Sequence, residues 1–477
     1  MTSGRYAAVD LGASSGRVVV GEVGPDRLDL TEVHRFANRP VRLPSGLHWD
    51  LVGLYGHVLD GLAAAGRAGP VTSIGVDTWA VDYGLLDRTG ALLGEPYCYR
   101  DSRTDGVADA VHARRSHAQL YAENGLQLLP FTTIYQLAAA AGTPQLEAAE
   151  HLLLVPDLVA SWLTGAQVAE LTNASTTGLL DVLSHEWSTS LAELVGVRPG
   201  LLPPLVAPGE RIGTLLPAVA AETGLDPGTP VVAVGSHDTA SAVVAVPMDS
   251  ATAAYVSLGT WGLVGVELDR PVLTEQARQA GFTNELGVDG RVRCLKNVMG
   301  LWLLSECLRT WRAAGRPADL PALLDAAAGL PPGGPVFDVA DPRFLPPGDM
   351  PARVAACVLE GGDPPLEGEV ALVRCVVDSL ALALAGAVRA AERIAGRPLR
   401  TVHVVGGGSL NALLCQLTAD AVGLPVVAGP VEATALGNVL VQARASGVLH
   451  GTLEDLRSLV RSTQVLRRVE PRVRRTA

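Results

Sequence analysis

The sequence predicts an α/β fold made of two related domains. Its length of 477 residues is more than one ordinary domain requires. Short apolar runs that read as strands alternate with longer helical patterns, which is typical of α/β proteins. A glycine-containing hairpin pattern also occurs twice, as AVDLGASSGRVVVGEV from Ala8 and as YVSLGTWGLVGVEL from Tyr255. Because the two copies are so far apart, we interpret them as the marks of a duplicated domain and not of a solenoid repeat.

The elements follow in order along the chain. Strands are expected over residues 7–12, 17–23, 72–87, 230–237, 253–268, 291–298 and 400–408, and helices over residues 51–66, 108–123, 297–315, 371–396 and 411–423. The segment 331–351 is rich in proline and glycine and is expected to be a long surface loop. We place the domain boundary near residues 240–250, which gives an N-terminal domain over 1–243, a C-terminal domain over 244–465 and a tail over 466–477.

Composition excludes several classes of protein. Hydrophobic residues make up 48% of the chain and charged residues 18%, which indicates a large core and not a disordered chain. The net charge of −12 argues against nucleic-acid and anionic-membrane partners. The six cysteines form no CxxC pair and read as reduced thiols, and no signal peptide is recognisable, so a cytoplasmic location is expected. The single lysine, Lys296, leaves no Walker A loop.

The first hairpin is interpreted as a phosphate-binding loop. Gly12 and Gly16 permit a tight turn whose backbone N–H groups and serine hydroxyls can face phosphate oxygens. Arg17 can add a charge-assisted contact, and Asp10 at the strand end could hold a water molecule of Mg²⁺. The alternative is an ordinary hairpin with a turn-capping aspartate. The second hairpin carries Ser257 where the first carries the acid, as expected if only one loop directs a metal.

Two further stretches are candidates for a site. Residues 406–408 are three consecutive glycines between a strand and a helix, where a ring or phosphate could approach the backbone closely; a crowded strand–helix turn is the alternative. In VVAVGSHDTASAVVAV, the polar residues His237, Asp238 and Thr239 interrupt an apolar run. A carboxylate is costly to place there without partners, which favours a chemical role. A helix beginning at Thr239, with Asp238 as its N-cap, is the compatible structural explanation.

The chain resembles the FGGY carbohydrate kinases of the actin-like ATPase superfamily. The resemblance covers nearly the whole chain, and its motifs are VDLGASSGR, IGVDTWAVDYGLLD, YRDSRTDG, LLLVPDLVASWLTG, ELTNASTTGLLD, SHDTASAV, SLGTWGLVGVE, TNELG, LKNVMGLWLL, VGGGSLNALLCQLTAD and AGPVEATALGN. It implies two actin-like, ribonuclease H-like ATPase domains with a cleft between them. SHDTASAV and LKNVMGLW distinguish the chain from glycerol and xylulose kinases.

The resemblance also assigns roles to individual residues. It implies that Asp238 is the catalytic base and that the remaining positions bind either ATP or the sugar. The implied ATP contacts are Ala13, Ser14, Ser15, Gly16, Arg17, Thr260, Ser305 and Gly407, and the implied sugar contacts are Ala80, His237, Asp238, Thr239 and Asn297. Two of these depart from the family pattern, which usually has glycine at the position of Ala80 and often glutamine at that of Ser305. The first change adds a methyl group to the sugar pocket, and the second removes a nucleotide hydrogen bond.

The implied reaction is transfer of the γ-phosphoryl group of ATP, with Mg²⁺, to the 1-hydroxyl of a ketose, L-rhamnulose, by a monomer or homodimer. Alternatives are a kinase for a related ketose such as L-fuculose or L-xylulose, a non-catalytic actin-like nucleotide-binding protein, and a sugar-responsive regulator, which would need a basic DNA-binding segment that the sequence lacks. Lesser candidates are Asp77 and Asp82 as sugar ligands or solvated strand-end acids, and Arg100, Asp101 and Arg103 as an ion network at the edge of the site.

Overall fold

The computed structural model describes residues 3–472 and divides the chain into two compact units. The first unit comprises Met1–Pro247, Leu268–Cys294 and Ala433–Gln464, and the second comprises Met248–Glu267, Leu295–Glu432 and Val465–Ala477. Two later segments of the chain therefore fold together with its N-terminal part to form the first unit. The expected boundary near residues 240–250 coincides with the first crossing at Pro247, whereas the domain limits 1–243, 244–465 and 466–477 remain predictions; residues 473–477 of the tail lie outside the described part.

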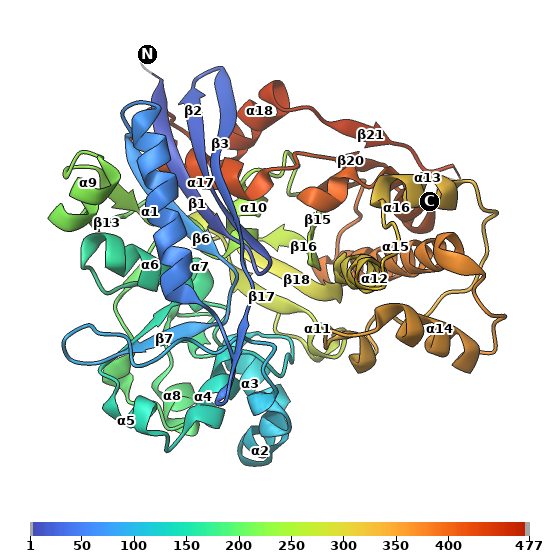
Figure 1. Cartoon of the computed structure of the whole chain (residues 1–477), viewed down its shortest axis with the longest axis horizontal. Coiled ribbons are helices and arrows are strands. Elements are labelled where there is room, and N and C mark those ends of the chain that lie inside the picture. Colours follow the sequence, from blue (N-terminus) through green and yellow to red (C-terminus); the bar gives the residue numbers. More distant parts are fainter. Residues whose placement is uncertain (1–2, 473–477) are drawn as a thin grey trace. The chain divides into compact units, whose positions relative to one another are not determined.

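A six-stranded sheet forms the centre of the first unit, in the order β13-β14-β6-β1-β2-β3 (Figure 1). Its strands are β1 (Gly4–Leu11), β2 (Ser15–Gly24), β3 (Arg27–Ala37), β6 (Ser73–Thr78), β13 (Arg211–Thr214) and β14 (Pro230–Val232). β1 pairs antiparallel with β2 and parallel with β6. In the second of these pairings Asp10 stands opposite Asp77, so the two carboxyl groups project from the same face of the sheet.

Helices cover both faces of this sheet. Helix α1 (Leu51–Arg67) packs on β2 and β3 with Leu51, Leu54, Val58 and Leu62 buried. Helix α17 (Ala433–Ala445) packs on β1 and β6 and against α10 (Asp238–Val244). The approach of α17 to α10 requires a glycine, because a Cβ at Gly437 would lie 1.7 Å from the backbone oxygen of Ser241. Since α10 begins at Asp238, this helix contact fixes where that carboxyl group lies.

The rest of the first unit consists of short elements. They are β4 (Val41–Leu43), β5 (Gly46–His48), β7 (Tyr83–Leu86), η1 (Ser102–Thr104), α2 (Val107–Arg114), α3 (His117–Asn124), α4 (Thr133–Ala140), α5 (Pro144–Ala148), β8 (His151–Leu154), α6 (Val155–Thr164), β9 (Ala169–Glu170), α7 (Leu171–Ala174), β10 (Leu180–Asp181), β11 (Glu186–Trp187), α8 (Thr189–Leu194), η2 (Pro199–Leu201), β12 (Leu205–Val206), α9 (Pro217–Thr223), α11 (Glu275–Gln279), β17 (Thr283–Leu286), η3 (Val288–Gly290) and α18 (Leu453–Thr463).

The second unit is built on strands in the order β18-β16-β15-β19-β20-β21. Its elements are β15 (Ala253–Leu258), β16 (Trp261–Leu268), β18 (Val292–Met299), α12 (Trp302–Ala313), α13 (Leu320–Ala328), η4 (Pro342–Phe344), α14 (Met350–Glu360), α15 (Gly368–Ala395), β19 (Thr401–Val405), η5 (Gly407–Leu410), α16 (Ala412–Val422), β20 (Val426–Ala428) and β21 (Arg467–Val469). An antiparallel hairpin, β15–β16, again stands beside a parallel strand, β19. The central topology of the first unit is thus repeated, as the duplicated pattern predicts.

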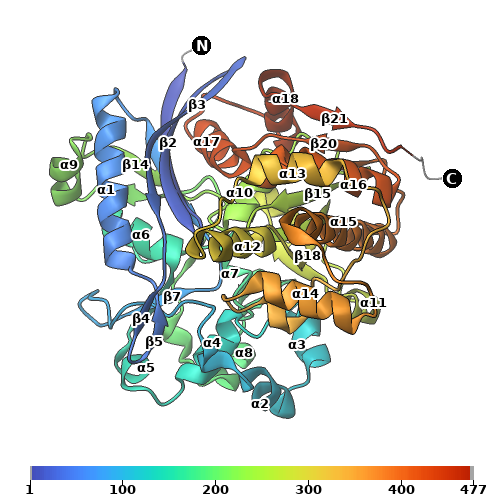
Figure 2. The same cartoon turned by 45° about the vertical axis from the view of Figure 1, so that its right-hand side comes forward.

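Helix α15 is the longest helix of the second unit and packs against α16 and β15 (Figure 2). By length and composition alone it could cross a membrane, with a mean hydropathy of 1.9 in its most apolar window. Within the structure, 67% of that window is buried. The apolar character of α15 is therefore that of a helix in a protein core.

Several expected elements have different bounds in the structure. The helix expected over 108–123 is two helices, because Ser116 forms a capping box with Gln119 and starts α3 anew. The strand expected over 72–87 is interrupted after Thr78, where Val81 adopts a φ of 71°. The helix expected over 297–315 begins only at Trp302, since residues up to Met299 belong to β18. The expected loop over 331–351 contains the short helix η4 and the first residues of α14.

Replacing Gly437 with alanine tests the packing that places α10. The new Cβ cannot fit beside the Ser241 carbonyl without moving α10, so we expect the free energy of unfolding to fall by about 3 kcal/mol, the upper part of the usual range for overpacking. Gly56→Ala is the matched control: Gly56 lies in α1 with nothing within 4 Å of its added Cβ, and there we expect a gain of about 0.5–1 kcal/mol. Urea unfolding measures both changes. Equal stability of the two variants would contradict this account.

Candidate active site

The first hairpin is held in shape by hydrogen bonds on both sides of its turn. The N–H of Gly12 donates to the Ser15 carbonyl over 2.9 Å, which closes the turn between β1 and β2. Asn38, at the end of β3, donates its side-chain amide to the Gly12 carbonyl over 2.8 Å and its backbone N–H to the Ser14 carbonyl over 3.1 Å. Ala13 and Ser15 are half-buried and Ser14 is exposed. The loop is thus a rigid structure with accessible N–H groups and hydroxyls, as a phosphate-binding loop requires.

Arg17 lies beside this loop and is paired with Asp10. Its Nε and Nη2 atoms donate to Asp10 Oδ2 over 2.8 and 2.6 Å. This ion pair fixes the direction of the Asp10 carboxylate, whose residue is only 6% exposed. Sequence reasoning expected the Arg17 guanidinium to face phosphate; in the structure its charge is directed first at Asp10.

Asp77 lies next to Asp10 and is fully buried. Its Oδ2 accepts a hydrogen bond from Asn438 of α17 over 2.5 Å, while its Oδ1 has no hydrogen-bond partner in the structure. Burial raises the pKa of Asp77 well above its ordinary value, and the nearby charge of Asp10 raises it further. An orphaned, buried carboxyl oxygen beside a second carboxylate is the kind of oxygen-rich arrangement that a hard divalent cation prefers.

Asp238 is the first residue of α10, and His237 is its N-cap. The expected helix start at Thr239 with Asp238 as the cap is therefore wrong by one residue. Thr239 Oγ1 donates to Asp238 Oδ1 over 2.9 Å, and His237 Nε2 lies 3.5 Å from the same oxygen. Burial of the carboxyl group raises the pKa of Asp238, and the attraction of His237 only partly offsets this. Because 32% of the side chain is nevertheless exposed, the carboxyl group is accessible to a ligand.

A buried ion pair stands behind His237. Glu285 Oε2 lies 3.2 Å from His237 Nδ1 and 3.1 Å from Arg293 Nη2, and Arg293 is completely buried. Burial alone would raise the pKa of Glu285, but Arg293 and then His237 reverse the effect and hold this pKa below its ordinary value. Arg293 Nη2 also lies 3.3 Å from His237 Nδ1, so the imidazole ring is held by both members of the ion pair. Sequence reasoning did not assign Glu285 or Arg293, although Glu285 lies in the matched motif TNELG.

Glu170 fixes the irregular segment that joins β14 to His237. One of its carboxyl oxygens accepts hydrogen bonds from the backbone N–H and the hydroxyl of Ser236, over 3.0 and 2.8 Å. The carboxyl group also accepts both the N–H and the hydroxyl of Thr172. Glu170 is 1% exposed. Because Ser236 is two residues before Asp238, this buried anchor limits the positions that the Asp238 carboxyl group can take. Glu170 was also missed, and its only sequence signal is the motif ELTNASTTG.

The segment that contains Ala80 also contains a buried carboxyl group, that of Asp82. Asp82 accepts hydrogen bonds from the indole nitrogens of Trp49 and Trp79, over 2.6 and 3.0 Å, and from the side-chain amide of Gln136 over 2.8 Å. It is therefore not a solvated strand-end acid. Burial raises the pKa of Asp82 to about 6 despite these donors. The backbone just before it is strained, because Val81 is a β-branched residue with a φ of 71°. Such strain is concentrated at functional sites.

Arg100, Asp101 and Arg103 of the YRDSR stretch each contact other groups of the first unit. Asp101 Oδ2 accepts the N–H of Leu47 over 2.7 Å, and Arg103 donates to Gln136 Oε1 over 2.7 Å. Arg103 also lies over the ring of Tyr97, and Arg100 lies over the ring of Tyr99. These contacts are made with backbone, amide and aromatic groups, and the ion network remains a prediction.

In the second unit, the second hairpin turns at Gly259 and Thr260. The N–H of Gly259 donates to the Trp261 carbonyl over 2.9 Å, and the Thr260 carbonyl accepts the N–H of Trp302. Gly300 makes this approach possible, since a Cβ there would lie 2.5–2.8 Å from the hairpin backbone. Ser257 is the second-last residue of β15, as Asp10 is of β1.

The glycine triplet of the second unit follows β19. A Cβ at Gly408 would lie 2.3 Å from the Leu258 side chain, so this glycine is needed for packing. Gly407 is exposed and has nothing within 4 Å of its added Cβ, which leaves its backbone open to a ligand. Asn297 is half-buried in β18, and Ser305 is exposed on α12. The α16 helix begins at Ala412, with Asn411 as its N-cap, one residue later than the expected start at 411.

Comparison with known proteins identifies the family. The model of the N-terminal domain of the FGGY family of carbohydrate kinases matches residues 6–245, and the model of its C-terminal domain matches residues 254–446. The chain belongs to the FGGY family of carbohydrate kinases. It is accordingly an enzyme that uses ATP as a substrate to phosphorylate a carbohydrate.

Curated relatives cover almost all of this family member. It is 41% identical over 445 residues to a rhamnulokinase from Bacteroides thetaiotaomicron, which covers 93% of the chain and 91% of the relative. It is 43% identical over 470 residues to a rhamnulokinase from Pectobacterium carotovorum, which covers 98% and 92%.

Solved structures of family members share the fold. A gluconate kinase from Lactobacillus acidophilus superposes with a TM-score of 0.78 at 15% identity, over 98% of the chain and 94% of that structure. A glycerol kinase from Plasmodium falciparum, solved with ADP, superposes with a TM-score of 0.77 at 15% identity, over 99% and 94%. The expected α/β fold with two domains is confirmed.

The environment of Asp82 generates a pH-dependent prediction. The pKa of Asp82 is about 6 in the folded protein, whereas that of an unperturbed aspartate is 3.8. Between pH 3.8 and pH 6, Asp82 is therefore protonated in the folded state and ionised in the unfolded state. This contribution to stability is complete below pH 4 and is lost as pH rises through 6, by about 3 kcal/mol in all. The difference in unfolding free energy between the native protein and Asp82→Asn should therefore shrink by this amount from pH 4 to pH 7.

Urea unfolding followed by tryptophan fluorescence measures this difference, since Trp49 and Trp79 contact the Asp82 carboxyl group directly. Asp26→Asn, at an exposed turn between β2 and β3, is the control and should show no such trend. A difference that is constant or grows with pH would contradict a neutral Asp82 below pH 6.

Proposed function

We propose that this carbohydrate kinase transfers the γ-phosphoryl group of ATP to the 1-hydroxyl of L-rhamnulose and so acts as a rhamnulokinase. The observation that carries the substrate assignment is the 41–43% identity to curated rhamnulokinases over nearly the whole chain. The polar residues around Asp238 support it, because a sugar has several hydroxyl groups that must be paired in the site.

In the proposed mechanism, Asp238 accepts the proton of the 1-hydroxyl as the new P–O bond forms. A sugar hydroxyl is too weak an acid to ionise at neutral pH, so its orientation and proton acceptance are the contributions that a base can make. His237 holds Asp238 from one side and Thr239 from the other. His237 is held in turn by Glu285, and Ser236 by Glu170, so the base is fixed by groups that need not touch the substrate.

The sugar and the nucleotide are assigned to different sets of residues. The sugar is proposed to contact Ala80, His237, Thr239 and Asn297. The methyl group of Ala80 is proposed to narrow the sugar pocket. ATP is proposed to contact the backbone and hydroxyl groups of the first hairpin turn and three positions of the second unit. These residues are Ala13, Ser14, Ser15 and Gly16, and Thr260, Ser305 and Gly407. The open backbone at Gly407 and the accessible turn at Ser14 fit these roles.

Mg²⁺ is the proposed metal, and Asp10 is its proposed partner, with the orphaned oxygen of Asp77 as a further acceptor. When bound, the ion would neutralise charge on the transferred phosphoryl group. The contact with Arg17 fixes the orientation of the Asp10 carboxyl group for this role. We also propose that the protein is cytoplasmic, that it has no nucleic-acid or membrane partner, and that it is a monomer or a homodimer.

The direct test combines a substitution with a panel of substrates. Asp238→Asn should lower kcat on L-rhamnulose by at least about 100-fold, the scale of losing a general base, while ATP binding is largely retained. Asp26→Asn is the matched control and should have native kinetics. Coupled ADP release measures turnover. A mutant that keeps more than a tenth of the native kcat would exclude Asp238 as the base.

In the same assay, the native enzyme should prefer L-rhamnulose over L-fuculose and L-xylulose by roughly 5- to 150-fold in kcat/KM, because a wrong configuration leaves a buried polar group unpaired at about 1–3 kcal/mol. Glycerol should be the poorest substrate. Ala80→Gly should lower the ratios by widening the pocket. Higher kcat/KM for glycerol or L-fuculose than for L-rhamnulose would overturn the substrate assignment and leave the kinase assignment intact.

A further inference from the structure

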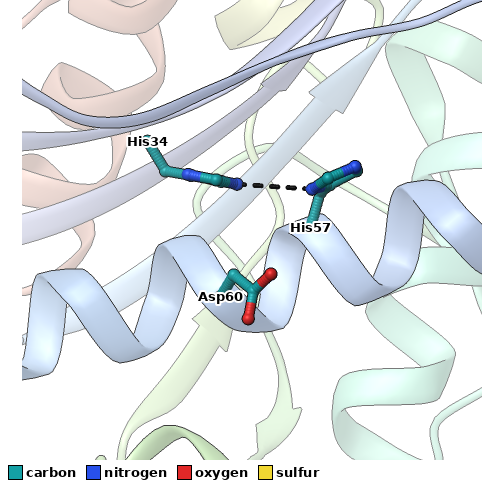
Figure 3. Close-up of side chains that lie close together, drawn as sticks. All are labelled: His34, His57 and Asp60. Atoms are coloured by element: carbon teal, nitrogen blue, oxygen red, sulfur yellow. Dashed lines mark hydrogen bonds between the residues drawn. The ribbon is translucent and has the colours of Figure 1, made fainter.

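A cluster of two histidines and an aspartate lies on the surface of the first unit, on the side of the sheet covered by α1. His34 comes from β3, whereas His57 and Asp60 come from α1 (Figure 3). One ligand atom from each side chain, an imidazole nitrogen or a carboxylate oxygen, lies within 4.8 Å of the others. None of the three residues belongs to the proposed sugar, nucleotide or magnesium contacts. We propose that the cluster is a binding site for a divalent first-row transition-metal ion such as Zn²⁺.

The distances fit the coordination chemistry of such an ion. His34 Nε2 and His57 Nδ1 are 3.5 Å apart, and Figure 3 shows the two rings directed toward one another. Two nitrogen ligands at about 2.0–2.1 Å from a tetrahedral Zn²⁺ lie about 3.4 Å apart. The imidazole pair therefore needs almost no movement to bind the ion. Two imidazoles and one carboxylate, with water in the fourth position, also form a donor set that favours Zn²⁺, Co²⁺ or Ni²⁺ over Mg²⁺.

The spacing on α1 supplies the third ligand. His57 and Asp60 are three residues apart and so project from the same face of the helix. Both are exposed, whereas His34 is half-buried. The Asp60 carboxylate can thus turn toward the two nitrogens without leaving solvent or breaking a packing contact. Coordination requires His34 Nε2 and His57 Nδ1 to be free of protons, so each neutral ring carries its single N–H proton on its other nitrogen, Nδ1 of His34 and Nε2 of His57.

The close approach of β3 to α1 is built into the packing. A Cβ at Gly61 would lie 2.3 Å from Val18 and 3.3 Å from the Cβ of His34, so only glycine allows α1 to lie this near the sheet. Phe36 stacks on the His57 ring, with centroids 4.7 Å apart and an angle of 13° between the rings. The imidazole of His57 is therefore held by an aromatic contact before any ion binds, which reduces the entropy lost on coordination.

The same phenylalanine connects the cluster to the first hairpin. Phe36 stands opposite Gly16 in the pairing of β2 and β3, and a Cβ at Gly16 would lie 2.3 Å from its ring. Two residues later, Asn38 holds the Gly12 and Ser14 carbonyls. An ion that joins α1 to β3 would thus restrain the strand that supports this loop. The site is a cross-link between a helix and a strand and takes no part in the phosphoryl transfer.

Isothermal titration of the full-length protein with ZnCl₂ tests the proposal. The titration is done in excess Mg²⁺, which occupies the carboxylates proposed to serve catalysis. We expect one equivalent of Zn²⁺ to bind to the native protein, with affinity lowered at least about tenfold by His57→Ala and by His34→Ala. His450→Ala removes an exposed histidine elsewhere in the first unit and should bind Zn²⁺ like the native protein.

A second measurement distinguishes a specific site from general loss of structure. Zn²⁺ should raise the Tm of the native protein and of His450→Ala, but not that of His57→Ala, which removes one proposed ligand at an exposed helix position. Co²⁺ bound to the native protein should give visible absorption bands that His57→Ala lacks. The proposal is overturned if His57→Ala and the native protein bind Zn²⁺ with the same stoichiometry and affinity, or if the native protein binds none in excess Mg²⁺.

Discussion

Carboxyl groups kept in a largely apolar interior are the constraint on which the first unit depends. The parallel pairing of β1 and β6 places Asp10 beside Asp77, and α10 begins with Asp238 on the same unit. Desolvation raises the pKa of Asp77 and of Asp238, and the nearby charge of Asp10 raises both further. Such an arrangement is stable only if neighbouring groups hold each carboxyl group in place. Those neighbours make up much of the structure around the site.

The neighbours act on each carboxyl group separately. Arg17 fixes Asp10 through two hydrogen bonds, and Asn438 fixes Asp77 from α17. Asp238 is set indirectly, because Glu170 anchors the segment before it and the Glu285–Arg293 ion pair holds His237 beside it. These positioning residues are more deeply buried than the base itself. The base keeps part of its surface exposed and can meet a hydroxyl group, whereas its supports are shielded from water.

The sequence was sufficient to predict the fold and the residues proposed to contact ligands. It was less informative about the buried residues that position those side chains. The repeated hairpin predicted the duplicated topology, because glycines and alternating valines mark a turn between strands wherever they occur. His237, Asp238 and Thr239 stood out as polar residues in an apolar run. Glu285, Arg293 and Asn38 did not, since each acts on the site through contacts between different structural elements, which the sequence does not show. The interruption of the 72–87 strand was also missed, because nothing in its composition predicts a left-handed valine at position 81.

The pH dependence of kcat/KM for the sugar tests the central claim, that the electrostatic surroundings of Asp238 set its readiness to accept a proton. The native enzyme should lose activity at low pH with a midpoint above 3.8, because burial raises the pKa of Asp238. His237→Asn removes the attraction that partly offsets burial, so its midpoint should move to higher pH at the same concentrations of Mg²⁺ and ATP. A midpoint that stays in place or moves to lower pH in His237→Asn would contradict the account.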